Sequence, residues 1–382
     1  MRASSSDTPS IAVIGAGIIG LACALEIADR GARVTLYEPN WPPRGASWAA
    51  AGMLAPAFEA AAPDGVHPKL FELCNMSAAL WPRWASALQD RTGYPSGFQP
   101  GPTLAVAREL PEVQHLKSIQ ARMASHPDRP RDCFSDLRTL APQLKTDLRA
   151  ALLLPSDGQI DNRLTLKALG VAIAQHERIT LKRTAAQLAM DGDRIGVPGH
   201  DAALICAGWA SAKTDLFEPA VPRAVTDRLS VLSEIQPYGG QMLSLAPTVG
   251  TPDITIRCGD LYIVPKADRI IVGATTEPGR VLDAADPDKI AKLRARAAAL
   301  CPALGNADMI ESWAGTRPGR ADHAPILGET ALASVFVAAG HFRNGILLAP
   351  LTAQFIADLI LAQRSHDLLQ AFSPQRTQPA QV

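Results

Sequence analysis

Three glycines and one acidic residue have the types and the spacing that bind a dinucleotide cofactor: Gly15, Gly17, Gly20 and Glu38. In a strand–turn–helix unit, the first glycine permits a tight turn, the second lets the backbone approach a pyrophosphate, and the third lets the helix pack closely on the strand. The N-terminus of the helix offers N–H groups and the positive end of its dipole to the phosphates. Glu38 would accept hydrogen bonds from ribose hydroxyls and would repel the 2′-phosphate of NADP, so the pattern favours FAD or NAD.

These residues need a strand, a helix and a second strand to position them. The apolar run 11–14 predicts a buried strand, residues 18–30 predict a helix, and residues 33–37 predict a second strand that ends at Glu38. A glycine-containing turn that binds nothing would not require this whole arrangement. The sequence therefore predicts a Rossmann-like α/β domain at the start of the chain.

Composition limits the other functions that the chain could have. Its 382 residues are enough for two domains, and 47% apolar with 19% charged residues is ordinary for a globular protein. Lys+Arg and Asp+Glu both number 37, and this zero net charge gives no sign of a nucleic-acid or anionic-membrane surface. The six cysteines lack metal-ligand spacing, so we expect no metal site and free thiols in a reducing cytoplasm. We expect no signal peptide and no membrane span, hence a soluble protein.

The remaining chain predicts a mixed order of elements. Helices are expected at 70–92, 110–124, 134–140, 162–177 (with Asn162 as N-cap), 287–300 and 346–363. Strands are expected within 95–106, 151–154, 202–206, 229–262, 269–272 and 335–338, and in a hairpin of 181–190 with 194–197. We therefore predict a discontinuous FAD-binding domain (1–92, 151–215 and 306–373) and an antiparallel-sheet, α+β substrate-binding domain (93–150 and 216–305). Residues 374–382 are expected to form a flexible tail.

Five further motifs carry a resemblance to a known family: AAAGML at 49–54, YIVP at 262–265, VGAT at 272–275, WAGTRPG at 313–319 and GHFRNGILLAP at 340–350. With the N-terminal pattern, they closely resemble the glycine oxidases of thiamine biosynthesis, FAD-dependent members of the D-amino-acid oxidase and sarcosine oxidase superfamily. The resemblance runs from about residue 10 to 365. It implies FAD extended along the first domain, a substrate pocket between the flavin and the second sheet, and a homotetramer.

The resemblance also implies which residues touch the cofactor. Besides the glycines and Glu38, it implies contacts from three segments and one isolated position: Ile18, Ile19, Ala46, Ser47, Ala51, Gly52, Met53, Ala185, His341, Phe342, Arg343, Asn344, Gly345, Ile346 and Leu347. The last seven should wrap the isoalloxazine, and the helix that follows them would direct N–H groups toward its N1–C2=O edge. A covalent flavin would need a cysteine in this last motif. Because the last cysteine, Cys301, precedes it, we expect FAD to be bound non-covalently.

Three side chains would bind the substrate if the resemblance holds: Tyr262, Arg317 and Arg343. Arg317 can form a bidentate pair with an α-carboxylate, Tyr262 can donate to the same group, and Arg343 would lie near the reacting carbon. No catalytic triad or carboxylate pair falls in the motifs, so no general base is assigned. Thr276 and Asp260 stand where relatives differ and could alter the pocket.

The reaction implied is oxidation of glycine, sarcosine or D-alanine to the imine, with hydrolysis to the 2-oxo acid and reduction of O2 to H2O2. It would supply the glycine imine for thiazole synthesis. Two alternatives stay open: a D-amino-acid dehydrogenase that passes electrons to a quinone, and a non-catalytic FAD-binding protein that serves a partner.

Overall fold

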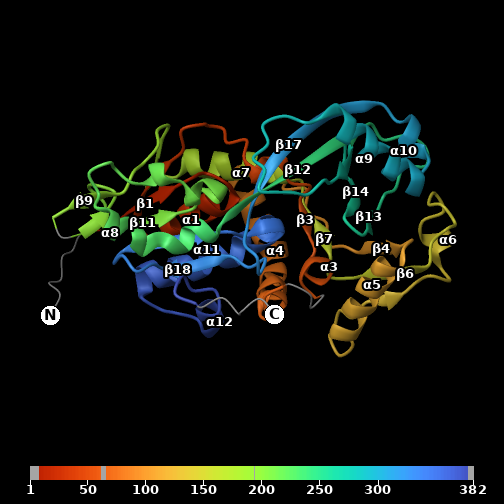
Figure 1. The fold of residues 1–382 in the computed structure, drawn as a ribbon, viewed down its shortest axis with the longest axis horizontal. Helices are drawn as coiled ribbons and strands as arrows, with labels where there is room; N and C mark the ends of the chain where they lie inside the picture. Colours follow the sequence, from red (N-terminus) through yellow and green to blue (C-terminus); the bar gives the residue numbers. More distant parts are fainter. Residues whose placement is uncertain (1–7, 62–65, 193, 377–382) are drawn as a thin grey trace.

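The chain forms two regions, each built around its own sheet, in the computed structural model shown in Figure 1. The structure describes residues 8–61, 66–192 and 194–376. The first region, on the left of Figure 1, contains a six-stranded sheet in the order β18–β19–β11–β1–β2–β8. The second region, on the right, contains a nine-stranded sheet. This α/β arrangement with a second, largely antiparallel sheet confirms the predicted fold class.

The six-stranded sheet is parallel except for its edge strand β18, which runs antiparallel to β19. Its strands are β1 (Ser10–Ile14), β2 (Arg33–Tyr37), β8 (Ile179–Lys182), β11 (Ala202–Ile205), β18 (Ile326–Glu329) and β19 (Val335–Ala339). Val13 lies opposite Leu36 on one side and Leu204 on the other. Because β1 is central and both its faces are covered, nearly all of its side chains are buried, which explains its continuous apolar run.

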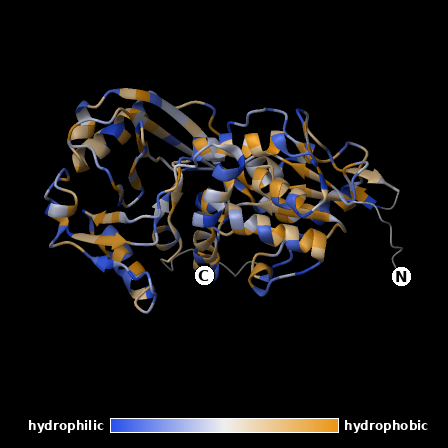
Figure 2. Cartoon of the chain, turned by 180° about the vertical axis from the view of Figure 1, so that it is seen from behind, coloured by the Kyte–Doolittle hydropathy of each residue, from blue (hydrophilic) through white to orange (hydrophobic). Residues whose placement is uncertain are grey.

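Four long helices cover one face of this sheet: α1 (Ile18–Asp29), α4 (Leu70–Thr92), α7 (Asn162–Gln175) and α11 (Gly345–Ala362). Ile11 and Val13 point into this helical layer, whereas Ala12 and Ile14 point to the opposite face. Among the described residues, one helical stretch, Phe342–Ala362, is apolar and long enough to span a bilayer, but 61% of its apolar window is buried. It packs on α1 and α4, and Figure 2 shows hydrophobic residues concentrated in these helices.

The opposite face is covered by short elements: β9 (Ala189–Asp191), β10 (Arg194–Gly196), η1 (Gly208–Ala212), η2 (Thr214–Leu216), α8 (Arg223–Thr226) and η3 (Asp227–Glu234). The prediction of strand from residue 229 onward is therefore wrong for residues 229–234, which belong to η3. Leu229 and Leu232 are spaced for a helical turn and bury together on the sheet. The predicted hairpin is shorter than expected, because residues 181 and 182 belong to β8; its turn residue Asp193 lies outside the described residues.

The nine-stranded sheet forms the second region, with one face packed on α9 (Pro287–Leu300). Its strands are β4 (Thr103–Ala107), β5 (Arg131–Asp132), β6 (Ala150–Leu154), β12 (Gln236–Leu245), β13 (Thr255–Cys258), β14 (Leu261–Pro265), β15 (Ile270–Gly273), β16 (Glu277–Pro278) and β17 (Met309–Gly319). All pairs are antiparallel except β4 with β13. The domain boundaries predicted from the sequence assign β6 and β17 to the FAD-binding domain. In the structure both strands belong to the nine-stranded sheet, where β6 pairs with β4 and β17 pairs with β12.

Short elements complete the chain: α2 (Ala46–Ala49), β3 (Met53–Leu54), α3 (Pro56–Ala60), α5 (Leu110–Arg122), α6 (Leu137–Leu140), β7 (Gly158–Gln159), α10 (Ala303–Asn306), η4 (Phe342–Asn344) and α12 (Asp367–Gln370). The N-cap of α7 is Asp161 and not Asn162, because the Asp161 carboxylate accepts from the N–H groups of Arg163 and Leu164. Of the predicted flexible tail, residues 377–382 lie outside the described residues. Arg376 donates to the carbonyl of Pro325 at 2.7 Å.

Candidate active site

The glycine-rich turn has the geometry that a pyrophosphate requires. Gly15 has a φ of +102°, which favours glycine, and its N–H donates to the carbonyl of Tyr37 at 2.9 Å. A Cβ on Gly20 would lie 1.9 Å from the Gly15 oxygen, so the helix packs on the turn through this glycine. A Cβ on Gly17 would meet only the Oγ of Ser47, at 3.4 Å. The space before Gly17 is therefore free of backbone, which fits a phosphate at the N-terminus of α1.

Glu38 and Ser47 are drawn to the same turn by hydrogen bonds. Glu38 Oε2 accepts from the N–H of Ala16 at 3.0 Å, and Ser47 Oγ accepts from the N–H of Ile18 at 3.0 Å. The N–H of Ile18 at this helix start therefore already has a partner within the protein. The contacts bring Glu38, Ser47 and the glycines into one cluster at the carboxyl end of β1 and β2.

We expect Glu38→Ala to weaken FAD retention while leaving the chain folded. The carboxylate is lost from the end of β2, where an adenosine ribose would be held, and the partly exposed side chain contributes little to the core. Flavin content after gel filtration and far-UV circular dichroism measure the two effects separately. Purified variant with a full complement of flavin would remove Glu38 from the site.

The segment after α2 is fixed by close backbone contacts. Gly52 has a φ of +76°, and a Cβ there would lie 2.2 Å from the carbonyl oxygen of Ile160. The N–H of Ile160 donates to the Gly52 carbonyl at 2.8 Å, and Met53 pairs with Gln159 in the β3–β7 ladder. The amide of Asn162 donates to the carbonyls of Ser47 and Trp48. The predicted cofactor residues Ala51, Gly52 and Met53 are thus held in one extended strip, the cofactor strip, directly after α2, the helix that begins at Ala46.

The predicted flavin-wrapping segment follows β19 and returns to the same edge of the sheet as the glycine turn. Burial lowers the pKa of His341 to about 3, so the ring is neutral; its Nε2 lies 3.2 Å from Thr352 Oγ1. The Leu347 carbonyl accepts from Ser77 Oγ at 2.7 Å and from Trp81 Nε1 at 2.9 Å. These bonds anchor the start of α11, and with it Asn344, Gly345 and Ile346.

Two other predicted cofactor residues lie at the periphery of this cluster. Ile19 is buried within the first turn of α1. Ala185 is exposed, three residues past the last residue of β8, at the same carboxyl edge of the sheet. Its contact with adenine stays a prediction. The residues present therefore fit an extended dinucleotide along this edge.

The sheet of the second region holds Tyr262 and Arg317 by means of glycines on neighbouring strands. Tyr262 on β14 lies opposite Gly273, where a Cβ would come within 2.2 Å of the ring. Arg317 on β17 lies beside Gly240, where a Cβ would come within 2.2 Å of Nη1. The two side chains therefore lie over the glycines of the sheet, and the positively charged Arg317 guanidinium lies near the Tyr262 hydroxyl.

This face of the sheet is directed toward the cofactor strip. Tyr262 packs in one cluster with Ala49 and Ala51, and Trp313 Nε1 donates to the Ala49 carbonyl at 2.9 Å. Burial raises the pKa of Tyr262, although three arginines oppose it, so the hydroxyl keeps its proton. A protonated tyrosine hydroxyl can donate a hydrogen bond to a carboxylate.

A second cluster, which the sequence did not reveal, surrounds Arg343. Its Nε lies 3.4 Å from Glu59 Oε2, and the other oxygen of that carboxylate accepts from Arg257 Nη1 at 2.8 Å. Burial would raise the pKa of Glu59, but Arg343 and Arg257 lower it to about 2. Glu59 is therefore ionised and shared by two guanidinium groups. A signal for Arg257 exists in the sequence, because the Gly259-Asp260 turn sets it opposite Tyr262.

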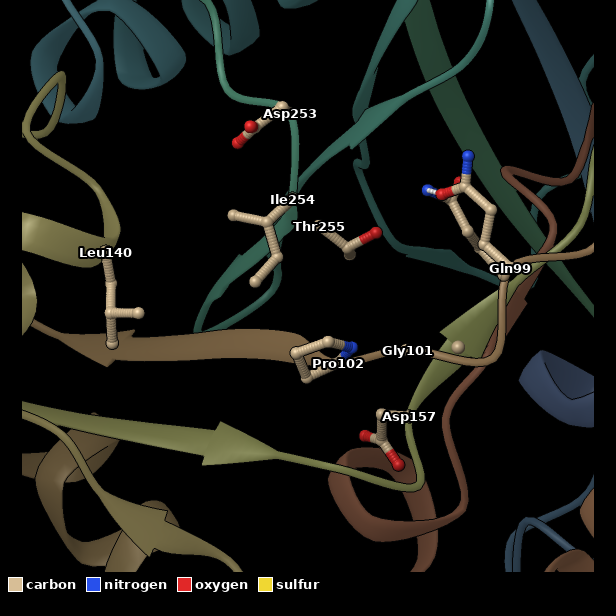
Figure 3. A pocket seen from close by; sticks show the side chains of 10 residues that line it. Gln99, Gly101, Pro102, Leu140, Asp157, Asp253, Ile254 and Thr255 are labelled. Atoms are coloured by element: carbon tan, nitrogen blue, oxygen red, sulfur yellow. Dashed lines mark hydrogen bonds between the residues drawn. The ribbon is translucent and has the colours of Figure 1, made fainter.

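Beside Asp157 lies a cavity of about 280 Å³ whose lining also includes Gln99 and Thr255 but not Tyr262, Arg317 or Arg343. In Figure 3, Asp157 lies below Gly101 and Pro102. Its carboxylate accepts from the N–H groups of Ala57 and Phe58, at the first turn of α3. Burial raises the pKa of Asp157 to about 7. The cavity therefore lies next to Asp157, the residue that holds the first turn of α3, and not at the substrate-binding face.

The two positions that depart from the family pattern do not join this face. Thr276 is exposed, whereas its neighbour Thr275 accepts from Arg317 Nη1 at 3.4 Å through its carbonyl. Asp260 is exposed at the β13–β14 turn and pairs with Arg296 on α9. These contacts give no support for a direct influence of the Thr276 or Asp260 side chain on the pocket.

Comparison with known proteins gives concordant matches. A family model described as DAO, FAD dependent oxidoreductase, matches residues 10–359. Glycine oxidase from Geobacillus kaustophilus is 30% identical, with 96% of each chain covered. The crystal structure of glycine oxidase from Geobacillus kaustophilus superposes with a TM-score of 0.86, covering 97% of this chain and 100% of that one. These matches confirm the resemblance stated from the motifs.

Longer proteins also match. The bifunctional protein ThiO/ThiG of Trichormus variabilis is 33% identical over 97% of this chain, and that of Synechocystis is 33% identical over the same share. The chain spans about half the length of these relatives, 55% and 54% respectively.

Proposed function

The chain belongs to the FAD-dependent oxidoreductase family, and from this premise we propose that it oxidises glycine and other small amino acids. Glycine, O2 and water would give glyoxylate, ammonia and H2O2 by way of the imine. The observation that carries the proposal is the Tyr262–Arg317 pair, which lies on a sheet face directed at the cofactor strip. The matches to glycine oxidases support glycine as the substrate.

The chain's own residues would bind and orient the amino acid. FAD, when bound, supplies the two-electron acceptor for amine oxidation. Arg317 would bind the α-carboxylate through both guanidinium nitrogens, and Tyr262 would donate its proton to the same group. The largely buried Glu59 and the partly exposed Arg343 would lie near the amine and the α-carbon. Fixing the carboxylate at one end leaves the substrate a single orientation, which is the main contribution to rate that these residues can make.

The test is an anaerobic reduction screen. Flavin bleaching is followed after addition of glycine, sarcosine, D-alanine, D-proline and larger D-amino acids under nitrogen, and O2 consumption is then measured in air. Bleaching with O2 uptake supports an oxidase. Bleaching with little O2 uptake would favour a dehydrogenase that uses a quinone, and no bleaching by any substrate would favour a non-catalytic FAD-binding protein.

We expect a graded substrate preference, with glycine, sarcosine and D-alanine all oxidised and bulky D-amino acids much slower. With the carboxylate at Arg317, only the side-chain direction varies, and a methylene there changes binding by about 1–3 kcal/mol. Values of kcat/KM across the series measure this preference. Faster oxidation of D-phenylalanine than of glycine would contradict a glycine oxidase.

The setting of the reaction is proposed on the same resemblance. We place the enzyme in the cytoplasm as a homotetramer that supplies glycine imine for thiamine thiazole synthesis, with FAD bound non-covalently. All six cysteines are buried, and Cys301 packs under α9, away from the cofactor strip. Acid precipitation should therefore release the flavin.

A further inference from the structure

Arg257 occupies an unusual position for a charged residue. It lies opposite Tyr262 on the adjacent strand, so both side chains project from the same face of the sheet. Its residue is 1% exposed, and its guanidinium carbon lies 3.9 Å from the centre of the Phe58 ring. The sheet thus directs a buried cation to the site next to a proposed substrate-binding residue.

Stability does not account for this burial. The Nε and Nη2 atoms of Arg257 have no hydrogen-bond partner among the described residues, and its one ion pair there is with Glu59. Unpaired buried N–H groups are costly, and a buried ion pair is often no more stable than apolar residues of the same volume. What the pairing does achieve is to fix Glu59, whose second oxygen is left for Arg343 at 3.4 Å.

We propose that Arg257 is a positioning residue of the active site: it holds the Glu59 carboxylate in place and ionised, and through Glu59 it holds Arg343. The assignment rests on the proposed amino-acid oxidase function. With Arg257 present, Glu59 divides its charge between two cations, and Arg343 stays loosely held within the predicted flavin-wrapping segment. Without Arg257, Glu59 keeps Arg343 as its one cation, at 3.4 Å, and burial then raises the pKa of its carboxyl.

Other titratable or charged groups lie around Glu59, and an experiment must distinguish their titration from that of Glu59. They are Cys74 of α4, His115 of α5, Asp157 before β7, Arg257 of β13, Arg317 of β17, His323 before β18 and Arg343 of η4. Burial keeps both histidines neutral and the thiol protonated, because it lowers the pKa of each histidine and raises that of the cysteine. Asp157 is the exception, since its pKa is about 7.

The experiment compares the pH dependence of kcat/KM for glycine in four holoenzymes: wild type, Arg257→Met, Glu59→Gln and the double variant, from about pH 5 to about pH 9. Removing the cation leaves burial to raise the pKa of Glu59, so protonation begins at higher pH. Because the pKa of Glu59 is about 2 in the wild type, Glu59 adds no acid limb in this pH range; we expect Arg257→Met to show an additional fall in kcat/KM toward about pH 5 that the wild type lacks. The double variant lacks the Glu59 carboxyl, so it should not show the additional acid limb of Arg257→Met. Any contribution of Asp157 to the pH dependence should remain.

A second readout does not depend on turnover. Glycolate, a carboxylate without an amine, should perturb the flavin spectrum, and its dissociation constant is measured over the same pH range. Arg257→Lys, which keeps the charge, should restore the wild-type limb. Arg376→Met is the matched control, because it removes another buried, ion-paired guanidinium, bonded to Asp322 at 3.0 Å, without touching Glu59.

Several results would overturn the assignment. An unchanged acid limb in Arg257→Met and in a second neutral variant, Arg257→Gln, measured in the same way, would do so. An additional acid limb that persists in full in the double variant would also do so. Failure of both neutral variants to fold would make Arg257 a structural residue. If the wild-type enzyme is not reduced by any amino acid, the proposed function fails, and that result is seen before any variant is compared.

Discussion

Arg317→Ala should lower kcat/KM for glycine by roughly 30-fold to 1000-fold, which corresponds to about 2–4 kcal/mol of lost carboxylate binding. The guanidinium lies on the substrate-binding face near Tyr262, so its removal leaves the hydroxyl as the neighbouring donor for a substrate carboxylate. Steady-state kinetics under air, with flavin content checked for each preparation, measure the loss. Near-normal kinetics would remove Arg317 from the site.

Two further variants show whether this loss is specific. Arg317→Lys should keep part of the activity with a raised KM, because an ammonium group offers a point charge in place of a planar fork. Arg294→Ala removes an arginine of α9, on the opposite side of the same sheet, where it donates to the carbonyls of Gly305 and Ala307. Its kinetics should stay close to those of the wild type.

Gly17→Val should fold and yet lose most of its FAD. Gly17 has a φ of −62° and a ψ of 174°, an extended conformation that valine readily adopts, and a Cβ there meets only Ser47 Oγ at 3.4 Å. The branched side chain would therefore occupy the place of the pyrophosphate without a clash inside the protein. Flavin absorbance per protein and the thermal unfolding midpoint separate cofactor loss from misfolding.

The control for this change is Gly196→Val on β10, where a Cβ would have no heavy atom within 4 Å. It tests valine in place of glycine in another extended segment. Flavin content should be unchanged. Equal flavin loss in both variants would mean that general destabilisation, and not the phosphate site, explains the effect.

Much of the first region could be predicted because its signals are local. The glycine spacing, the apolar run of β1 and the acid at the end of β2 all lie between residues 10 and 38, and each has one structural solution. The fold class is confirmed for the same reason. The boundaries of the second region were harder to predict, since the place of β6 and β17 depends on pairing with strands far away in the chain.

The site residues that the sequence did not reveal depend on tertiary contacts. Glu59 lies in a short helix whose first turn is held by Asp157, about a hundred residues further along. Nothing local marks that carboxylate as buried. Arg257 was within reach, since the two-residue turn after Cys258 fixes its register with Tyr262. The predicted flavin contacts are grouped by the fold, but each contact stays a prediction.

The glycines beneath Tyr262 and Arg317 have a consequence for how this enzyme could acquire new substrates. Since Gly273 and Gly240 set how deep those side chains lie on the sheet, a methyl group at either glycine would lift one of them by steric displacement alone. The pocket would become shallower while keeping the same chemical groups. Selection or engineering could therefore adjust the depth of the substrate site from positions that never touch the substrate, and alanine at 240 or 273 is the smallest such step.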